Sequence, residues 1–215
     1  MTPAPRRIGV GGTGGTGGTG GTGAVGGVVL AGGAGRRFGA PKATAMIGGQ
    51  SLVERAVQIL RIAGCDPVVV VARAETPLPA LGESGAIVRD DGEGALGAIA
   101  VGCDALDTDQ VVVLACDLPN ASSVVARLVD DPRPAVVAAD LDGQVQPLCA
   151  RYPRAAAVEA ARALVAAGDR RTRSLPKALR AGVVIAALDD ELLNVNTPAD
   201  LDRVTERRRR FSRRR

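Results

Sequence analysis

The sequence predicts an α/β fold, a three-layer, Rossmann-like arrangement in which a mainly parallel mixed sheet is flanked by helices. Short apolar runs rich in valine alternate along the chain with segments of helical pattern, which is typical of this fold class. Several runs are apolar throughout, as in strands buried on both faces. The chain has 215 residues, of which 46% are apolar and only three are aromatic. Its core must therefore be built from Val, Leu, Ile and Ala.

The first half of the chain holds three predicted strands and two predicted helices. A capping box starts the first helix, because Ser51 and Glu54 have the spacing at which each side chain can accept a hydrogen bond from the other's backbone N–H. The expected strands are residues 25–31, 67–72 and 86–88, and the expected helices are residues 51–63 and 95–105.

The second half continues the alternation. Residues 111–116 (VVVLAC) are the strongest buried-strand pattern in the chain. An Ala-rich amphipathic helix and a final helix that begins with Thr as N-cap and Pro at the first helical position follow later. The other expected strands are residues 135–139, 146–152 and 182–187, and the two helices cover residues 154–167 and the segment from Thr197 onward.

Composition divides the chain into three parts. Residues 1–23 include a repeated Gly-Gly-Thr pattern that cannot form a core, so we expect a disordered extension. The predicted domain spans residues 24–206. Residues 207–215 contain seven arginines, without which the formal net charge falls from +4 to −3. We interpret this basic tail as a solvated chain end. The alternative is that it binds an acidic protein or nucleic acid; of these two, nucleic acid is not the expected partner.

The residue types that are absent exclude several functions. The chain contains no histidine, which excludes Ser-His-Asp and Cys-His catalysis and His-ligated zinc. None of the four cysteines is spaced as C-x-x-C, so we expect small buried side chains in a reducing cytoplasm. No apolar run approaches the roughly 18 residues of a membrane span. We therefore expect a cytoplasmic protein that does not enter a membrane.

A glycine-rich, basic loop follows the first predicted strand. The segment LAGGAGRRFGAPK lets backbone N–H groups approach an anion closely and adds positive charge for a polyphosphate. It is neither a Walker A loop nor a Rossmann fingerprint, because the required spacings are absent. The glycines of this loop are Gly32, Gly33 and Gly35, and its cations are Arg36, Arg37 and Lys42.

Acidic residues follow two other predicted strands. Asp117 comes directly after the strand at residues 111–116, so its carboxylate should lie at the carboxyl edge of the sheet and face the glycine-rich loop. One carboxylate together with phosphate oxygens suits Mg²⁺. The alternative for Asp117 is a cap on a helix that begins near Ser122. Asp90 and its neighbour Asp91 follow the strand at residues 86–88, and either of them can be the acidic residue at its close.

The segment L-A-G-G-x-G-R-R-x-G-x-x-K closely resembles the signature of the molybdenum cofactor guanylyltransferases, within the nucleotide-diphospho-sugar transferase superfamily. This resemblance implies a nucleotidyltransferase fold in which Leu30, Ala31, Gly32 and Lys42 bind the nucleotide, with Gly33 and Gly35 in the same loop. The C-D-x-P segment implies that Asp117 binds Mg²⁺, and Asp90 would help to hold the nucleotide.

Three later segments resemble the acceptor side of the same family. They are Gln146-Pro-Leu, Gly168-Asp-Arg-Arg171 and Asn194-Val-Asn196-Thr-Pro. The resemblance implies that Asn194 and Asn196 contact a pterin or shape its pocket; the plain alternative for the last segment is a turn into the final helix. Two positions depart from the family pattern: Val71 stands where an Asn is common, and Ala95 stands where a Pro is common.

The activity implied by the resemblance is transfer of GMP from GTP to the phosphate of molybdenum-bound molybdopterin, with release of pyrophosphate. Lys42, Asp117 and one or both of Arg36 and Arg37 would be catalytic, and Mg²⁺ would be the cofactor. Molybdoenzymes or cofactor-insertion proteins are the expected protein partners. The alternatives are a cytidylyltransferase for the same pterin, another sugar- or alcohol-phosphate nucleotidyltransferase, and a binding module without catalysis.

Overall fold

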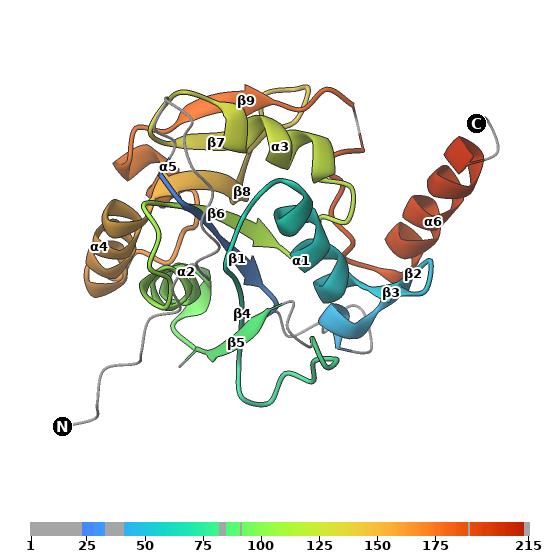
Figure 1. Cartoon of the computed structure of the whole chain (residues 1–215), viewed down its shortest axis with the longest axis horizontal. Helices are drawn as coiled ribbons and strands as arrows, with labels where there is room; N and C mark the ends of the chain where they lie inside the picture. Colours follow the sequence, from blue (N-terminus) through green and yellow to red (C-terminus); the bar gives the residue numbers. More distant parts are fainter. Residues whose placement is uncertain (1–22, 33–40, 82–84, 91, 189, 213–215) are drawn as a thin grey trace, which may run out of the picture.

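The computed structural model describes residues 23–32, 41–81, 85–90, 92–188 and 190–212, with the backbone alone for 207–212. Within these residues, a seven-stranded sheet has the order β5-β4-β1-β6-β8-β7-β9 (Figure 1). Its strands are β1 (Val25–Leu30), β4 (Val68–Ala72), β5 (Ala86–Arg89), β6 (Gln110–Ala115), β7 (Val136–Ala139), β8 (Val145–Pro153) and β9 (Gly182–Ile185). Neighbouring pairs are parallel except where β8 meets β6 and β7. The predicted mainly parallel, mixed sheet is confirmed.

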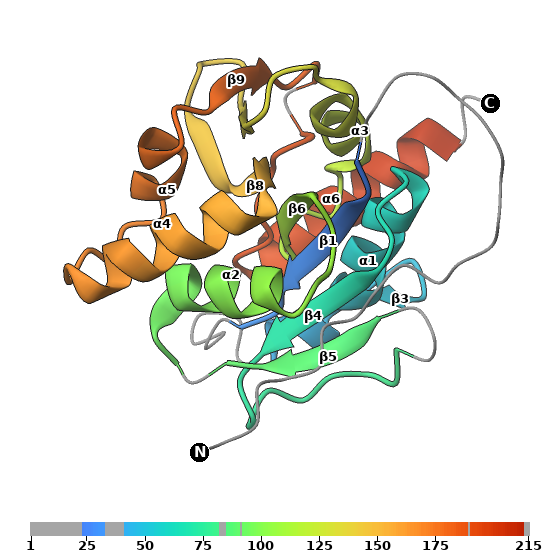
Figure 2. The ribbon, with the colours of Figure 1, turned by 60° about the vertical axis from the view of Figure 1, so that its left-hand side comes forward.

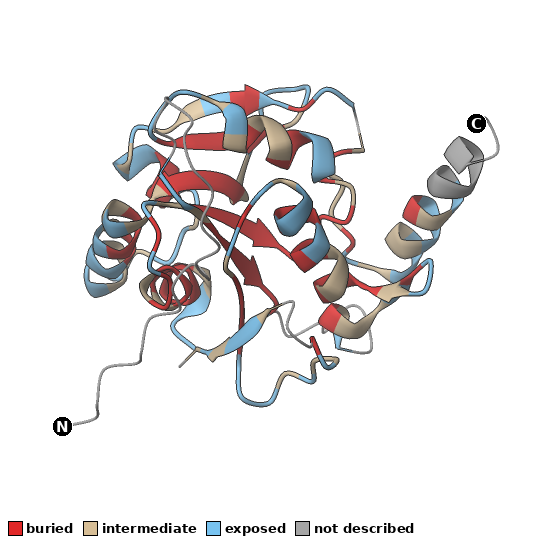
Figure 3. Ribbon diagram, in the orientation of Figure 1, coloured by how far each residue is buried: buried red, intermediate tan, exposed pale blue. Residues whose placement is uncertain are grey.

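Helices cover both faces of the sheet, as Figure 2 shows. On one face lie α1 (Leu52–Ile62) and α3 (Ser122–Asp130), and on the other lie α2 (Gly94–Asp104), α4 (Arg154–Ala166) and α5 (Ser174–Ala178). Alternate strand residues serve the two faces: Val29 and Val70 pack toward α1, whereas Val28 and Val69 pack toward α2. The three-layer arrangement is therefore confirmed, and Figure 3 shows the buried strands at its centre.

One close contact fixes α2 on the sheet. A side chain at Gly102 would place its first carbon 2.6 Å from Val28 Cγ1 and 2.7 Å from Val71 Cγ2. Glycine therefore lets the helix backbone lie directly on the valines of β1 and β4. The other end of α2 begins beside the carboxyl ends of the same strands, where Gly94 and Ala95 line a pocket with Leu30 and Ala31.

The structure adds elements that sequence patterns did not predict. The short helix η1 (Lys42–Thr44) leads into the hairpin of β2 (Met46–Ile47) and β3 (Gln50–Ser51), and α5 follows α4. The helix α6 (Pro198–Ser212) packs against β2. It continues past residue 206, where the tail was predicted to begin. Among the described residues, none of the helices is both long and apolar enough to cross a bilayer.

Candidate active site

Four neighbouring parallel strands end beside one pocket. The residues that follow β5, β4, β1 and β6 include Asp90, Arg73, Gly32 and Asp117, and all four line it. Backbone hydrogen bonds hold these strand ends in register: the Ala31 N–H donates to Val71 O at 2.9 Å. These residues therefore gather at the carboxyl edge of the sheet, because parallel strands bring their carboxyl ends to the same side; that a ligand binds there stays a prediction.

At one end of the pocket, Lys42 joins two residues that are remote in sequence. Its Nζ donates to Asp117 Oδ2 at 2.6 Å and to Asn196 Oδ1 at 2.7 Å. The side chains of Lys42 and Asp117 are only 13% and 22% exposed, so their ion pair is partly shielded from water. The other oxygen, Asp117 Oδ1, is buried and has no hydrogen-bond partner among the described residues. A carboxylate thus keeps an unused acceptor beside a cation.

The turn before α6 holds Asn196 at this end. The Val195 N–H donates to Asp117 O at 2.9 Å, and the Val195 side chain is buried in a small cluster with Ile47, Leu52 and Val204. The Asp200 carboxylate accepts hydrogen bonds from the Asn196 N–H at 3.0 Å and from the Thr197 N–H at 2.9 Å. The Thr197 hydroxyl, which also donates to it, is the main cause that lowers the pKa of Asp200.

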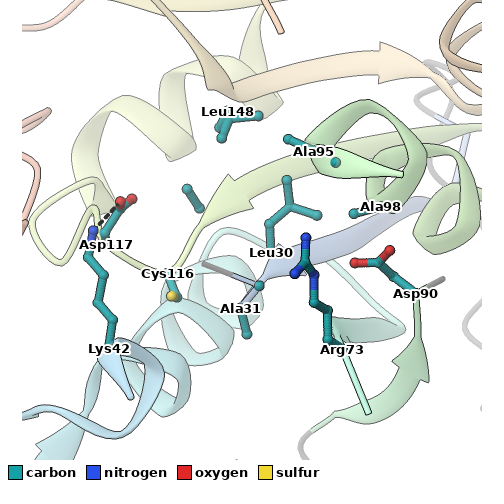
Figure 4. Close-up of a pocket in the computed structure, with 13 residues that line it drawn as sticks. Leu30, Ala31, Lys42, Arg73, Asp90, Ala95, Ala98, Cys116, Asp117 and Leu148 are labelled. Carbon is teal, nitrogen blue, oxygen red and sulfur yellow. Dashed lines mark hydrogen bonds and ion pairs between the residues drawn. The ribbon is translucent and has the colours of Figure 1, made fainter. Parts of the chain in front are cut away.

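The other end of the pocket carries Asp90 and Arg73, away from Lys42 and Asp117 (Figure 4). The Asp90 N–H donates to Ala72 O at 3.1 Å, which ties the end of β5 to β4. The Asp90 carboxylate accepts from the Gly92 N–H. A first side-chain carbon at Gly32 would lie 3.8 Å from Asp90 Oδ2. Gly32 therefore gives a ligand close access to the backbone between the two ends.

An apolar surface separates the two polar ends. Leu30 lies between them, and Leu148, Ala95 and Ala98 line the pocket above it in the view of Figure 4. Ala95 lies in the first turn of α2, where Gly94 has a φ of +82°. Ala95, which stands where a Pro is common, therefore lies in a helix start that Gly94 forms with a positive φ. The Val71 side chain is buried in the core, so it supplies no polar group to the pocket.

Most described residues that were predicted to bind the nucleotide line this single pocket. They are Leu30, Ala31, Gly32, Lys42, Asp90 and Asp117. Their assigned roles stay predictions. The other predicted loop residues, Gly33, Gly35, Arg36 and Arg37, lie outside the described residues, as does Asp91, the alternative to Asp90. Arg73 was missed, although its position directly after a buried strand is the same signal that identified Asp117.

The segments assigned to the acceptor side separate into two places. Pro147 on β8 and Arg170 and Arg171 after α4 line an open groove, together with Gly143, Gln144, Val145, Thr172 and Arg173. Asn196 instead contacts Lys42, which lines the first pocket, although Asn196 itself is not among the lining residues. The Asn194 side chain donates weakly to Leu192 O at 3.4 Å and is not among the lining residues of either cavity. The segment Gln146-Pro-Leu reaches both cavities, because Leu148 lines the pocket of Lys42; a shared acceptor surface stays a prediction.

Charge in the groove is partly satisfied by the protein. Arg171 Nη2 pairs with Asp169 Oδ2 at 2.9 Å, and the hydrogen bonds of the Arg171 side chain hold the pKa of Asp169 well below its usual range. Arg170 Nη1 donates to Glu93 O at 2.9 Å. The contact of Arg170 with Glu93 fastens the loop after α4 to the start of α2. The groove nevertheless keeps a positive lining that suits an anionic acceptor.

The cysteines take no part in thiolate chemistry. All four are free and buried, and burial raises the pKa of each to about 12. A thiol with such a pKa stays protonated near neutral pH. The prediction of small buried side chains is confirmed.

Comparison with known proteins places this geometry in context. A family model described as a MobA-like NTP transferase domain matches residues 27–183. A protein of Chloroflexus aggregans named "Probable molybdenum cofactor guanylyltransferase" is 36% identical over 206 residues, covering 81% of this chain and 90% of the relative. A protein of Mycobacterium ulcerans with the same name is also 36% identical, over 187 residues and with the same coverage.

Solved structures show the same fold at lower identity. Molybdopterin-guanine dinucleotide biosynthesis protein A of Archaeoglobus fulgidus has a TM-score of 0.65 at 23% identity, covering 86% of this chain and 98% of that one. The 2-C-methyl-D-erythritol 4-phosphate cytidylyltransferase of Thermus thermophilus has a TM-score of 0.64 at 19% identity, covering 85% and 98%. The fold is therefore shared by transferases whose names specify different nucleotides.

Proposed function

This chain belongs to the MobA-like NTP transferase family and is a nucleotidyltransferase, and we propose that it transfers GMP from GTP to the phosphate of molybdenum-bound molybdopterin. An oxygen of the acceptor phosphate forms a bond to the α-phosphorus of GTP. The bond from that phosphorus to the oxygen bridging the α- and β-phosphates breaks, and pyrophosphate leaves. The product is the guanine dinucleotide form of the cofactor.

The observation that carries this proposal is the contact of Lys42 with Asp117 inside the pocket, at 2.6 Å. It joins the end of the glycine-rich loop to the carboxyl end of β6, where a triphosphate can meet a cation and a carboxylate together. Lys42 is a mobile point charge that can exchange the carboxylate for phosphate oxygens. Asn196, which now accepts from Lys42, can then orient the bound phosphates or the acceptor.

The residues at this end fit a magnesium ion held jointly with the substrate. Asp117 Oδ1 is a buried acceptor with no partner among the described residues. Those residues contain no cluster of three carboxylate or thiol side chains that would bind a metal ion alone. Mg²⁺ commonly takes one or two carboxylates and completes its shell with phosphate oxygens and water. When bound, it would neutralise charge on the triphosphate.

Catalysis by these residues needs no general base. A phosphate acceptor is already anionic near neutral pH, so it can attack without losing a proton to the protein. The contribution of Lys42, and of Arg36 or Arg37, is then to position the triphosphate and to stabilise the charge of the leaving pyrophosphate. The absence of histidine from the chain is compatible with this chemistry.

Two choices remain open to direct test: the base and the acceptor. The names of the relatives favour guanine, and the shared fold of a cytidylyltransferase keeps cytosine as the alternative. Pyrophosphate release should be measured with GTP, CTP, ATP or UTP, Mg²⁺, and either molybdenum-bound molybdopterin or a sugar 1-phosphate. We expect release with GTP and the pterin.

Each other outcome of this assay points to one alternative. Release with CTP and the pterin identifies a cytidylyltransferase, and release with a sugar phosphate identifies a different acceptor class. Saturable binding of nucleotide with no release in any mixture identifies a binding module. The expected cytoplasmic location and the transfer of product to molybdoenzymes or cofactor-insertion proteins stay predictions.

A further inference from the structure

Arg73 is a pocket residue to which the proposed reaction has so far given no role. It follows β4 directly and lines the pocket opposite Lys42 and Asp117 (Figure 4). Its backbone carbonyl accepts a hydrogen bond from Arg89 Nη1 at 2.7 Å, which ties it to the end of β5. Among the described residues, no carboxylate forms an ion pair with its guanidinium. An anchored backbone thus presents a cationic side chain to the pocket.

The period of a strand explains why this side chain points to the pocket. Val69 and Val71 both pack on the α2 side of the sheet. Arg73 stands two residues further along, so an extended chain directs it to the same side, beyond the end of the core. Val71 stays buried in the core, whereas Arg73 carries its charge to the pocket from the same side of the strand.

The layout of the pocket separates phosphate from base. Lys42 and Asp117 line one end and suit a triphosphate, with Asn196 bound to Lys42. Leu30 lies between the two ends, and together with Ala98 it gives an apolar surface that suits the flat face of a base or a sugar. Arg73 and Asp90 lie at the far end (Figure 4). A nucleotide with its phosphates at Lys42 therefore directs the edge of its base toward Arg73 and Asp90.

We propose that Arg73 is a specificity-determining residue that recognises guanine, its guanidinium donating to O6 and N7 of the base. Guanine offers these two acceptors side by side, and a planar arginine fork matches them. The Asp90 carboxylate accepts from N–H groups on the adjoining edge. Adenine carries a donor amino group in place of O6, so it would turn a donor toward Arg73. This inference rests on the proposed use of GTP.

The test compares ligands that differ by a single atom. Binding of GTP and of 7-deaza-GTP, which lacks the N7 acceptor, is measured with Mg²⁺ for the full chain and for Arg73→Ala. A bidentate contact of this kind contributes about 5- to 100-fold in affinity. We expect the parent protein to prefer GTP over 7-deaza-GTP by about 10-fold, and Arg73→Ala to bind both equally and more weakly. ATP should gain relative to GTP in the variant.

Two further variants separate recognition of the base from general charge. Arg73→Lys keeps the positive charge but loses the fork, so it should retain little of the preference for GTP over 7-deaza-GTP. Arg162→Ala removes an exposed arginine of α4 that pairs with Asp104 outside the pocket, and it should leave the preference unchanged. If Arg73→Ala weakens GTP, 7-deaza-GTP and ATP by the same factor, the side chain binds phosphate, and the inference is overturned.

The outcome also distinguishes this inference from the proposed function. A parent protein that binds CTP in preference to GTP refutes the guanylyltransferase assignment, whatever Arg73 does. A parent protein that selects GTP, together with an Arg73→Ala variant that keeps the full selectivity, refutes the role of Arg73 alone. Urea unfolding of Arg73→Ala checks the fold, and a midpoint equal to that of the parent protein is expected, because the side chain is exposed and lies outside the core.

Discussion

The two ends of the pocket are built in opposite ways. At the end proposed to hold the phosphates, Lys42 donates to Asp117 at 2.6 Å and to Asn196 at 2.7 Å. At the base end, Arg73 and Asp90 line the same pocket, yet no ion pair joins Arg73 to a described carboxylate. One end is neutralised within the protein, whereas the other presents its charges to the pocket. Substrate must therefore displace contacts at the first end and can add contacts at the second.

This difference assigns different work to the two ends. Groups that exchange a protein contact for a substrate contact suit catalysis, because their partners can change as charge moves during the reaction. Charged groups without an ion-pair partner suit recognition, since a wrong base leaves them unsatisfied and costs affinity. We therefore expect substitutions at the phosphate end to reduce turnover most and those at the base end to change selectivity.

The largest effect should come from the carboxylate at the phosphate end. Asp117→Ala should reduce turnover by about 10²–10³-fold or more, because it removes the carboxylate expected to hold Mg²⁺ with the phosphates. The measurement is pyrophosphate release at saturating GTP, Mg²⁺ and acceptor. Asp117→Asn keeps the shape without the charge and should fail similarly. Turnover near that of the parent protein in either variant would disprove the metal assignment.

A smaller effect should follow removal of the cation. Lys42→Ala should weaken GTP about 10- to 100-fold, the usual contribution of a hydrogen bond to a charged group. Calorimetric titration with GTP measures this change. Mn²⁺ alone should bind the variant more tightly than the parent protein, because Asp117 no longer pairs with Lys42. Unchanged affinity for both ligands would mean that the ion pair does not compete with substrate.

Access between the two ends can be tested at Gly32. Among the residues that the structure describes, a methyl group there meets only Asp90 Oδ2, at an ordinary contact distance of 3.8 Å, so the fold should tolerate Gly32→Ala. A nucleotide that lies close to this backbone would be displaced, and we expect about 10-fold weaker binding of GTP with an unchanged midpoint of urea unfolding. Full affinity in the variant would place the nucleotide elsewhere in the pocket.

The smallest effect concerns the turn that presents Asn196. Hydrogen bonds from Thr197 lower the folded-state pKa of Asp200 below its ordinary value of 3.8. The stability from these bonds is thus complete above that value and is lost as pH falls through the lower, folded-state pKa. Asp200→Ala should lower the free energy of unfolding at pH 7 by about 1 kcal/mol and weaken the acid dependence of urea unfolding below pH 4.

A matched cap elsewhere provides the control for Asp200. Glu54 makes the corresponding contacts with Ser51 at the start of α1, outside the pocket of Lys42 and Asp117. Glu54→Ala should cost a similar free energy of unfolding and leave the affinity for GTP unchanged. Asp200→Ala should in addition weaken GTP slightly, because Asn196 loses its support. An equal loss of GTP affinity in both variants would show a general effect of stability.

The predicted strands and helices were confirmed within one to two residues at most of their ends. The Ser51–Glu54 capping box forms as expected, since the signal is local to four residues. The hairpin of β2 and β3 and the short helix η1 were missed, because each spans only two or three residues per element and gives no periodic pattern. The reach of α6 to Ser212 was missed because its arginine run resembles a solvated tail.

The sequence by itself determined the succession of strands and helices along the chain, the glycine-rich loop and the carboxylate after the best buried strand. These features depend on neighbours in sequence, and their physical meaning can be read one segment at a time. It also indicated that Lys42 and Asp117 share a site, because parallel strands present their carboxyl ends to one edge.

Only the tertiary structure decided which groups meet. It placed Asn196, and not Asn194, on Lys42, because Val195 is buried between them and its N–H bonds to Asp117 O. It brought Arg73 to the pocket and left Val71 in the core. Lys42 contacts Asp117 and Asn196, which lie 75 and 154 positions away in the sequence. Contacts over such separations depend on how helices and strands pack. Such packing has no signature in any one segment of the chain.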